Sequence, residues 1–116
     1  MLQVSAQSKI FLAIEAVDFR KGIDGLSAVC RQKLESDPFG GAFFIFCNRR
    51  RTALRILAYD GQGYWLCTKR LSRGKFYWWP TSNDSTFSLS PSQLQVLLWN
   101  GNPMMAQIQE FWRKVS

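Results

Sequence analysis

The chain has 116 residues, 47% of them apolar, and a formal net charge of +7. A chain of this length and apolar content is expected to fold as one domain, residues 1–116, and is not a disordered protein. No run approaches the roughly 18 apolar residues of a membrane span, and residues 1–9 lack the regions of a signal peptide. We therefore expect a cytoplasmic protein without a membrane partner.

The chain has no histidine and three cysteines, Cys30, Cys47 and Cys67, which lie far apart in apolar segments. We expect three buried thiols and no metal site, because zinc sites usually need Cys/His pairs. Histidine is the commonest general base, and the acids are too dispersed for a two-metal site. Full phosphate-binding glycine motifs are missing as well. We expect no catalytic residues and no cofactor; the least favoured alternative is a metal-dependent nuclease that uses Asp18 or Asp24.

The first predicted elements are a strand and a helix. Residues 10–17 are apolar apart from Glu15, which indicates a strand. Asp18 is a candidate N-cap for the helix that follows. Apolar residues then recur at helical spacing: Phe19, Ile23, Leu26, Cys30 and Leu34. Gly22 and Gly25 weaken its first turn, and turn-forming residues at 36–41 end it.

Residues 42–79 show strand and turn signals in alternation. We predict an antiparallel meander with strands at 42–47, 53–59, 64–70 and 75–79. The turns between them would be 48–52, 60–63 and 71–74. Together with the N-terminal strand, this predicts an α+β fold in which two or three helices cover one face of the sheet.

Helices are predicted again after Pro80. Ser90 is a candidate N-cap, with Pro91 at the first helical position and Gln93 as a capping-box partner, so a helix is expected over 91–98. Apolar residues between Met104 and Lys114 predict a short final helix. Residues 99–116 are therefore a tail or docking helix, which would pack on the core or on a partner.

The excess positive charge lies in one window, residues 49–75. This window holds eight bases and the single acid Asp60, whereas the rest of the chain has seven of each. The eight bases are Arg49, Arg50, Arg51, Arg55, Lys69, Arg70, Arg73 and Lys75. In a meander, alternate turns leave the same end of the sheet, so the turns 48–52 and 71–74 should lie roughly 10 Å apart, with Asp60 at the other end.

Such a localised basic patch is typical of proteins that bind polyanions. We predict that its bases contact nucleic-acid phosphates; the alternative is a solvated sheet edge that resists aggregation. A trial register pairs Tyr59 with Tyr64, Arg70 with Lys75 and Cys47 with Ala53. It predicts one dry face and one face that mixes aromatic and basic side chains. The mixed face suits stacking of single-stranded bases, although aromatic cross-strand pairs are also ordinary in sheets.

Four short motifs resemble one protein family. They are DFRKGIDGL at 18–26, YDGQG at 59–63, KRLSRGKF at 69–76 and LSPSQL at 89–94. In this order, over about residues 10–98, the chain is similar to the TnpB (second open reading frame) accessory proteins of insertion-sequence family 66. Phe19 stands where we expect methionine in most relatives, and the tail from Trp99 is less typical of the family.

The resemblance implies a bacterial mobile-element protein, encoded beside the transposase and needed for efficient transposition, with no established catalytic role of its own. The family's charged motif positions, whose roles are not established, would be Asp18, Arg20, Lys21, Asp24, Lys69, Arg70, Arg73 and Lys75. The sequence thus predicts a non-catalytic accessory protein that binds DNA, the transposase or both through a basic β-hairpin surface. The alternative is an adaptor that binds an acidic surface of the transposase without contacting DNA.

Overall fold

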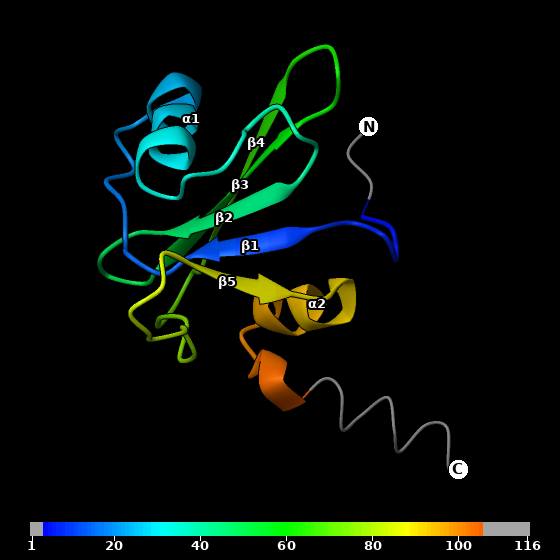
Figure 1. Cartoon of the computed structure of the whole chain (residues 1–116). Helices are drawn as coiled ribbons and strands as arrows, with labels where there is room; N and C mark the ends of the chain where they lie inside the picture. The colour runs from blue at the N-terminus through cyan, green and yellow to red at the C-terminus, as the bar shows by residue number, and fades with distance from the viewer. Residues whose placement is uncertain (1–3, 106–116) are drawn as a thin grey trace.

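The computed structural model in Figure 1 describes residues 4–105, in which a mixed sheet separates two α-helices. The elements are β1 (Ile10–Ala13), α1 (Ile23–Gln32), β2 (Phe43–Cys47), β3 (Ala53–Tyr59), β4 (Tyr64–Arg70), β5 (Thr86–Leu89), α2 (Pro91–Leu98) and the 3₁₀ turn η1 (Pro103–Met105). The α+β class is confirmed. In the described part of the chain, no helix is long and apolar enough to cross a membrane.

The strands form one sheet in the order β4-β3-β2-β1-β5, in which β1 runs parallel to β2 and the other neighbours are antiparallel. Strands β2, β3 and β4 form the first three strands of the predicted meander, and Tyr59 pairs with Tyr64 as predicted. Cys47, however, pairs with Leu54 instead of Ala53. Because side chains alternate between faces, this shift of one residue exchanges the faces predicted for β2 relative to β3.

The predicted strand at 75–79 is wrong. Phe76 and Trp79 are buried, with exposed fractions of 1% and 6%, while Tyr77 between them is exposed. This spacing of three does not fit the two-residue period of a strand. The segment crosses the face of the sheet on which α2 packs, and the fifth strand is β5, which pairs with β1.

The two helices cover opposite faces of the sheet, so the prediction that they share one face is wrong (Figure 1). Adjacent parallel strands such as β1 and β2 need a crossover connection, and α1 lies in it. The buried side chains of α1 pack on Phe44, Phe46 and Leu57. Helix α2 follows the edge strand β5 and packs, together with Phe76 and Trp79, on the other face.

The start of one α-helix agrees with the sequence prediction, and the start of the other does not. Helix α2 has the predicted capping box between Ser90 and Gln93. Helix α1 begins later than predicted, with Gly22 at the N-cap position in place of Asp18. Residues Pro103–Met105 form a 3₁₀ turn, and the rest of the final helix predicted up to Lys114 lies outside the described residues.

The three thiols differ in exposure. Cys30 and Cys47 are buried as predicted, and burial raises the pKa of Cys30 to about 12 and that of Cys47 to about 11. Cys67 is exposed, contrary to the prediction. It lies on β4, one of the two edge strands, whose side chains are covered less than those of the central strands.

Candidate nucleic-acid interface

The first basic turn, residues 48–52, is organised by the side chain of Asn48. Its Oδ1 accepts hydrogen bonds from the backbone amides of Thr52 (2.9 Å) and Ala53 (3.2 Å), and its Nδ2 donates to Thr52 Oγ1 (2.9 Å). Arg51 adopts a left-handed conformation with φ of 57°, and its side chain is half-buried. Arg49 and Arg50 are exposed in this braced turn.

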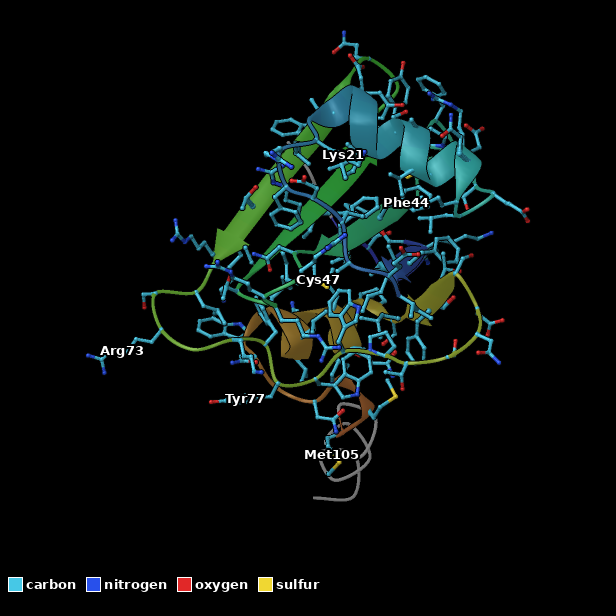
Figure 2. The ribbon with its side chains drawn as sticks, turned by 90° about the vertical axis from the view of Figure 1, so that its left-hand side faces the viewer. Lys21, Phe44, Cys47, Arg73, Tyr77 and Met105 are labelled. Carbon is cyan, nitrogen blue, oxygen red and sulfur yellow. The ribbon has the colours of Figure 1, made fainter. Side chains whose placement is uncertain are left out.

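The second basic segment, residues 71–75, lies directly beside this turn. The amide of Leu71 donates to the carbonyl of Thr52 (2.9 Å), and the amide of Phe76 donates to the carbonyl of Arg51 (2.7 Å). The prediction that the two basic segments share one end of the sheet is therefore confirmed, although no fourth meander strand follows. Arg73 is exposed and projects away from the body of the molecule in Figure 2.

Asp60 lies at the opposite end of β3 and β4. At the basic end of these strands Ala53 pairs with Arg70, whereas at the other end Tyr59 pairs with Tyr64. The Asp60 carboxylate accepts hydrogen bonds from two backbone amides of its own turn and from Trp65 Nε1, and these bonds lower its pKa. Charge is thus separated along the strands, as predicted.

Two of the eight predicted bases are engaged within the protein. Arg55 donates from Nη1 to the carbonyl of Lys21 (2.9 Å), and its guanidinium lies 4.6 Å from the centroid of the Phe19 ring. Lys69 donates from Nζ to the carbonyl of Leu98 at the end of α2. Arg55 therefore holds the segment before α1 against the sheet, and Lys69 connects β4 to α2.

The segment 18–21 adds charge beside the first basic turn. Arg20 forms an ion pair of 2.7 Å with Asp18, and the pKa of Asp18 falls to about 2 because the Arg20 side chain and backbone amide donate to its carboxylate. An open depression of about 600 Å³ is lined by Val17, Asp18, Phe19, Arg20, Asn48, Arg49 and Arg50. Lys21 is exposed next to it, and Asp24 is exposed in the first turn of α1.

The depression shows that the segment 18–21 flanks the first basic turn and leaves its tip uncovered. Sequence reasoning missed this contact and the bracing role of Asn48. The only sequence signal for the contact was the crowding of charges between Asp18 and Asp24, and an asparagine at the start of a turn is too common to reveal the bracing role.

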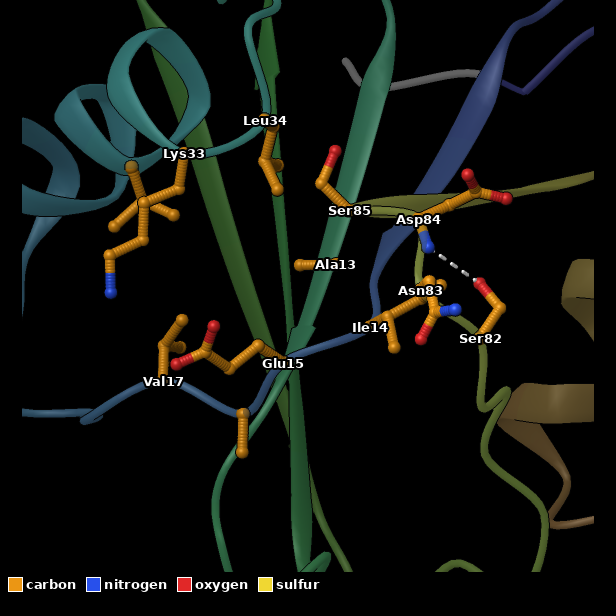
Figure 3. Close-up of a pocket in the computed structure, with 12 residues that line it drawn as sticks. Ala13, Ile14, Glu15, Val17, Lys33, Leu34, Ser82, Asn83, Asp84 and Ser85 are labelled. Atoms are coloured by element: carbon orange, nitrogen blue, oxygen red, sulfur yellow. Dashed lines mark hydrogen bonds between the residues drawn. The ribbon is translucent and has the colours of Figure 1, made fainter.

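A second cavity, of about 280 Å³, lies between the end of β1, α1 and the loop 82–85 (Figure 3). Its charged lining residues are Glu15, Lys33 and Asp84. This mixture differs from the basic segments, so the cavity is not part of the candidate interface. Among residues 4–105, no three His, Cys, Asp or Glu side chains are grouped so that they could hold a metal ion.

The predicted mixed face of aromatic and basic side chains does not exist as an open surface. Phe43 and Ile45 are buried on the α2 side of the sheet, whereas Leu57 is buried beneath α1. The prediction failed because the central strands are covered on both faces and because the β2–β3 register is shifted. Tyr77, which lies in the predicted fourth strand, is exposed on the crossing segment instead.

The chain is thus a small α+β protein in which two basic segments meet at one end of a mixed sheet. The family model TnpB_IS66, described as IS66 Orf2 like protein, matches residues 8–107. The chain therefore belongs to this family of transposition accessory proteins, as its motifs indicated.

Two relatives come from Sinorhizobium fredii (strain NBRC 101917 / NGR234). The uncharacterized protein y4jC is 37% identical over 98 residues, which cover 84% of this chain and 83% of the relative. The uncharacterized protein y4hO is 35% identical over 98 residues, which cover 84% of each chain. No solved structure matches this chain.

Proposed function

We propose that this protein is a non-catalytic accessory factor that binds DNA during transposition, alone or together with the transposase, through the basic end of its sheet. The basic end comprises Arg20, Lys21, Arg49, Arg50, Arg51, Arg70, Arg73 and Lys75. The observation that carries the proposal is the pair of backbone hydrogen bonds that joins residues 51–52 to residues 71–76. These bonds turn two basic stretches of sequence into one surface.

The arrangement of charge suits a phosphate backbone. Arg49, Arg50, Arg70, Arg73 and Lys75 are exposed, so their charges are available to phosphates without breaking contacts of the core. The acid Asp60 lies at the other end of the strands. A one-sided field of this kind steers a polyanion toward one end of the molecule and orients it there.

The proposal that the protein is non-catalytic is supported by the small number of side chains that could act as catalytic groups. The sequence has no histidine, and the raised pKa values of Cys30 and Cys47 keep these thiols protonated near neutral pH. Asp18 is engaged by Arg20. A magnesium-dependent nuclease assay tests this point: DNA cleavage that is lost in Asp18→Asn or Asp24→Asn would contradict it.

The binding experiment measures fluorescence anisotropy of a labelled DNA duplex over a series of salt concentrations. For wild type we expect log affinity to fall linearly with log salt, with a slope of about −0.9 for each phosphate contact. Arg49→Glu/Arg50→Glu should weaken binding to all sequences and flatten the slope. The matched control is Lys9→Glu/Arg31→Glu, which makes the same change in net charge.

The control residues lie at the opposite end of the sheet. The carbonyl of Lys9 accepts from the amide of Phe43 at the start of β2. Arg31 donates to Ser27, whose hydroxyl contacts the Tyr64 hydroxyl beside the Asp60 turn. If both double variants weaken binding equally, the attraction depends on net charge alone and the proposed surface is wrong.

The same variants separate DNA binding from the adaptor function. Co-purification with the transposase after nuclease treatment, together with no retardation of DNA by the protein or by its complex, would replace the proposal with a protein adaptor. Loss of DNA retardation in Arg49→Glu/Arg50→Glu, with transposase binding retained, would support the proposal that the protein binds DNA directly.

A further inference from the structure

Two aromatic side chains are strongly exposed beside the basic end: Tyr77, with an exposed fraction of 79%, and Trp99, with 83%. Both adjoin Asn100, which follows α2. The Asn100 side chain accepts from the amide of Tyr77 (3.1 Å) and donates to the carbonyl of Lys75 (3.0 Å). The crossing segment and the end of α2 are thus fixed to each other, with one exposed ring on each.

The fixed position of both rings follows from their surroundings. Phe76 and Trp79 are buried on either side of Tyr77, and Trp79 Nε1 donates to the carbonyl of Ile14 (3.1 Å). The end of α2 is closed by a hydrogen bond of 2.8 Å from the amide of Gly101 to the carbonyl of Val96. These anchors hold the backbone at both rings while leaving the rings in solvent.

One lysine lies against the Trp99 ring, and two further exposed bases precede Tyr77 in the chain. Lys69 Nζ lies 5.2 Å from the centroid of the Trp99 ring and donates to the carbonyl of Leu98. Lys75 is exposed two residues before Tyr77, and Arg73 projects on the same side of the molecule as Tyr77 in Figure 2. The hydrogen bond from the amide of Phe76 to the carbonyl of Arg51 makes this surface continuous with the basic end.

We propose that Tyr77 and Trp99 form a stacking platform for unpaired bases, so that the ligand of the basic end is single-stranded or locally opened DNA. This inference rests on the proposed DNA-binding function. Exposed rings among cations suit a polyanion with π-faces, because bases stack on the rings while Lys and Arg hold the phosphates. A protein partner would more often meet aromatic anchors within a surface depleted of lysine.

The platform distinguishes single strands from duplexes. In a duplex the faces of the bases are stacked on one another, and only phosphates and groove edges are accessible. An opened strand offers base faces to both rings while its backbone follows Arg73 and Lys75. The rings therefore favour a strand that has been opened, and the basic end alone serves duplex binding.

The test compares a labelled single-stranded oligonucleotide with a duplex of the same sequence, using the full chain. Tyr77→Ala/Trp99→Ala should lower affinity for the single strand by about tenfold or more. Affinity for the duplex should change by less than about twofold, and the salt slope should stay the same for both ligands, since no phosphate contact is removed. Tyr77→Phe/Trp99→Phe, which keeps two rings, should bind the single strand almost as wild type does.

The control is Phe39→Ala, which removes an aromatic side chain with an exposed fraction of 54%. Phe39 packs on Tyr59 and Tyr64 at the opposite end of the sheet, so single-strand binding should be unchanged. Equal losses in Phe39→Ala and in the double alanine variant would overturn the platform.

Other outcomes separate this inference from the proposed function. Wild-type affinity of the double alanine variant for single strands, with duplex binding intact, would overturn the platform and leave the proposed function standing. If the variant keeps single-strand affinity but no longer co-purifies with the transposase, the rings are a protein-docking surface and the platform is wrong. If wild type binds neither form of DNA, both proposals fail.

Discussion

The amide of Phe76 donates a hydrogen bond of 2.7 Å to the carbonyl of Arg51, two residues that lie far apart in the sequence. This bond and the one from Leu71 to Thr52 place the segment after β4 against the β2–β3 turn without forming a strand. The buried Phe76 ring fixes the segment from the core side. The surface that we propose for DNA binding therefore depends on backbone contacts between two basic loops.

Asn48→Ala should destabilise this arrangement. The substitution removes the acceptor of two backbone amides, those of Thr52 and Ala53. Partly buried donors that lose their acceptor cost about 1–3 kcal/mol in the free energy of unfolding, which urea denaturation can measure. Asn48→Asp keeps an acceptor oxygen and should recover most of the loss. Equal stability of the alanine variant and wild type would show that the turn holds its shape without Asn48.

Predictions from local sequence succeeded where a few neighbouring residues determine the structure. The capping box of Ser90 and Gln93 and the hairpin at Asp60 depend on contacts within three residues, and both are present. The parallel pairing of β1 with β2 depends on contacts across more than thirty residues, as in the pair Ile10 and Phe43. No local pattern encodes such a pairing, and the same holds for β5, whose Leu89 pairs with Ile10.

Thiol labelling should distinguish the three cysteines. In the folded protein, Cys67 should react with a thiol reagent at neutral pH, because it is exposed on an edge strand. Cys30 and Cys47 should react only after unfolding, since burial blocks the reagent and raises their pKa values to about 12 and 11. Cys67→Ser should abolish the fast reaction. Fast labelling of a second thiol in the folded state would contradict the described core.

The ion pair of Asp18 and Arg20 predicts that the stability of the folded protein depends on pH. The pKa of Asp18 in the folded protein is about 2, below its usual value of 3.8. Stability contributed by the ionised carboxylate is therefore fully present above about pH 4 and is lost as the pH falls toward about 2. Titration followed by NMR should show the low pKa of Asp18 in wild type and a value closer to 3.8 in Arg20→Gln. An unchanged pKa in the variant would assign the shift to another group.

The candidate site was predictable in outline because charge density is a property of sequence. The rule that alternate turns of a meander leave the same end of the sheet correctly placed the turns 48–52 and 71–74 together. This rule needs only the strand order β2–β3–β4. The engagement of single side chains was not predictable. Arg55 contacts Lys21 and Phe19 across a packing interface, and Lys69 reaches the end of α2. Such side-chain contacts depend on the tertiary fold.

Arg55 should therefore act as a positioning residue, in contrast to Arg49 and Arg50. Arg55→Met keeps an unbranched apolar stem but removes the hydrogen bond to Lys21 and the charge over Phe19. We expect a loss of about 1 kcal/mol in the free energy of unfolding.

The same variant should keep the wild-type slope of DNA affinity against salt, because no phosphate contact is removed. Arg49→Met is the matched control, since it makes the same substitution at an exposed position of the basic turn. It should leave stability unchanged and reduce the salt slope by about one unit. A reduced slope in Arg55→Met would show that its guanidinium leaves Phe19 to contact DNA, and Arg55 would then belong to the basic end.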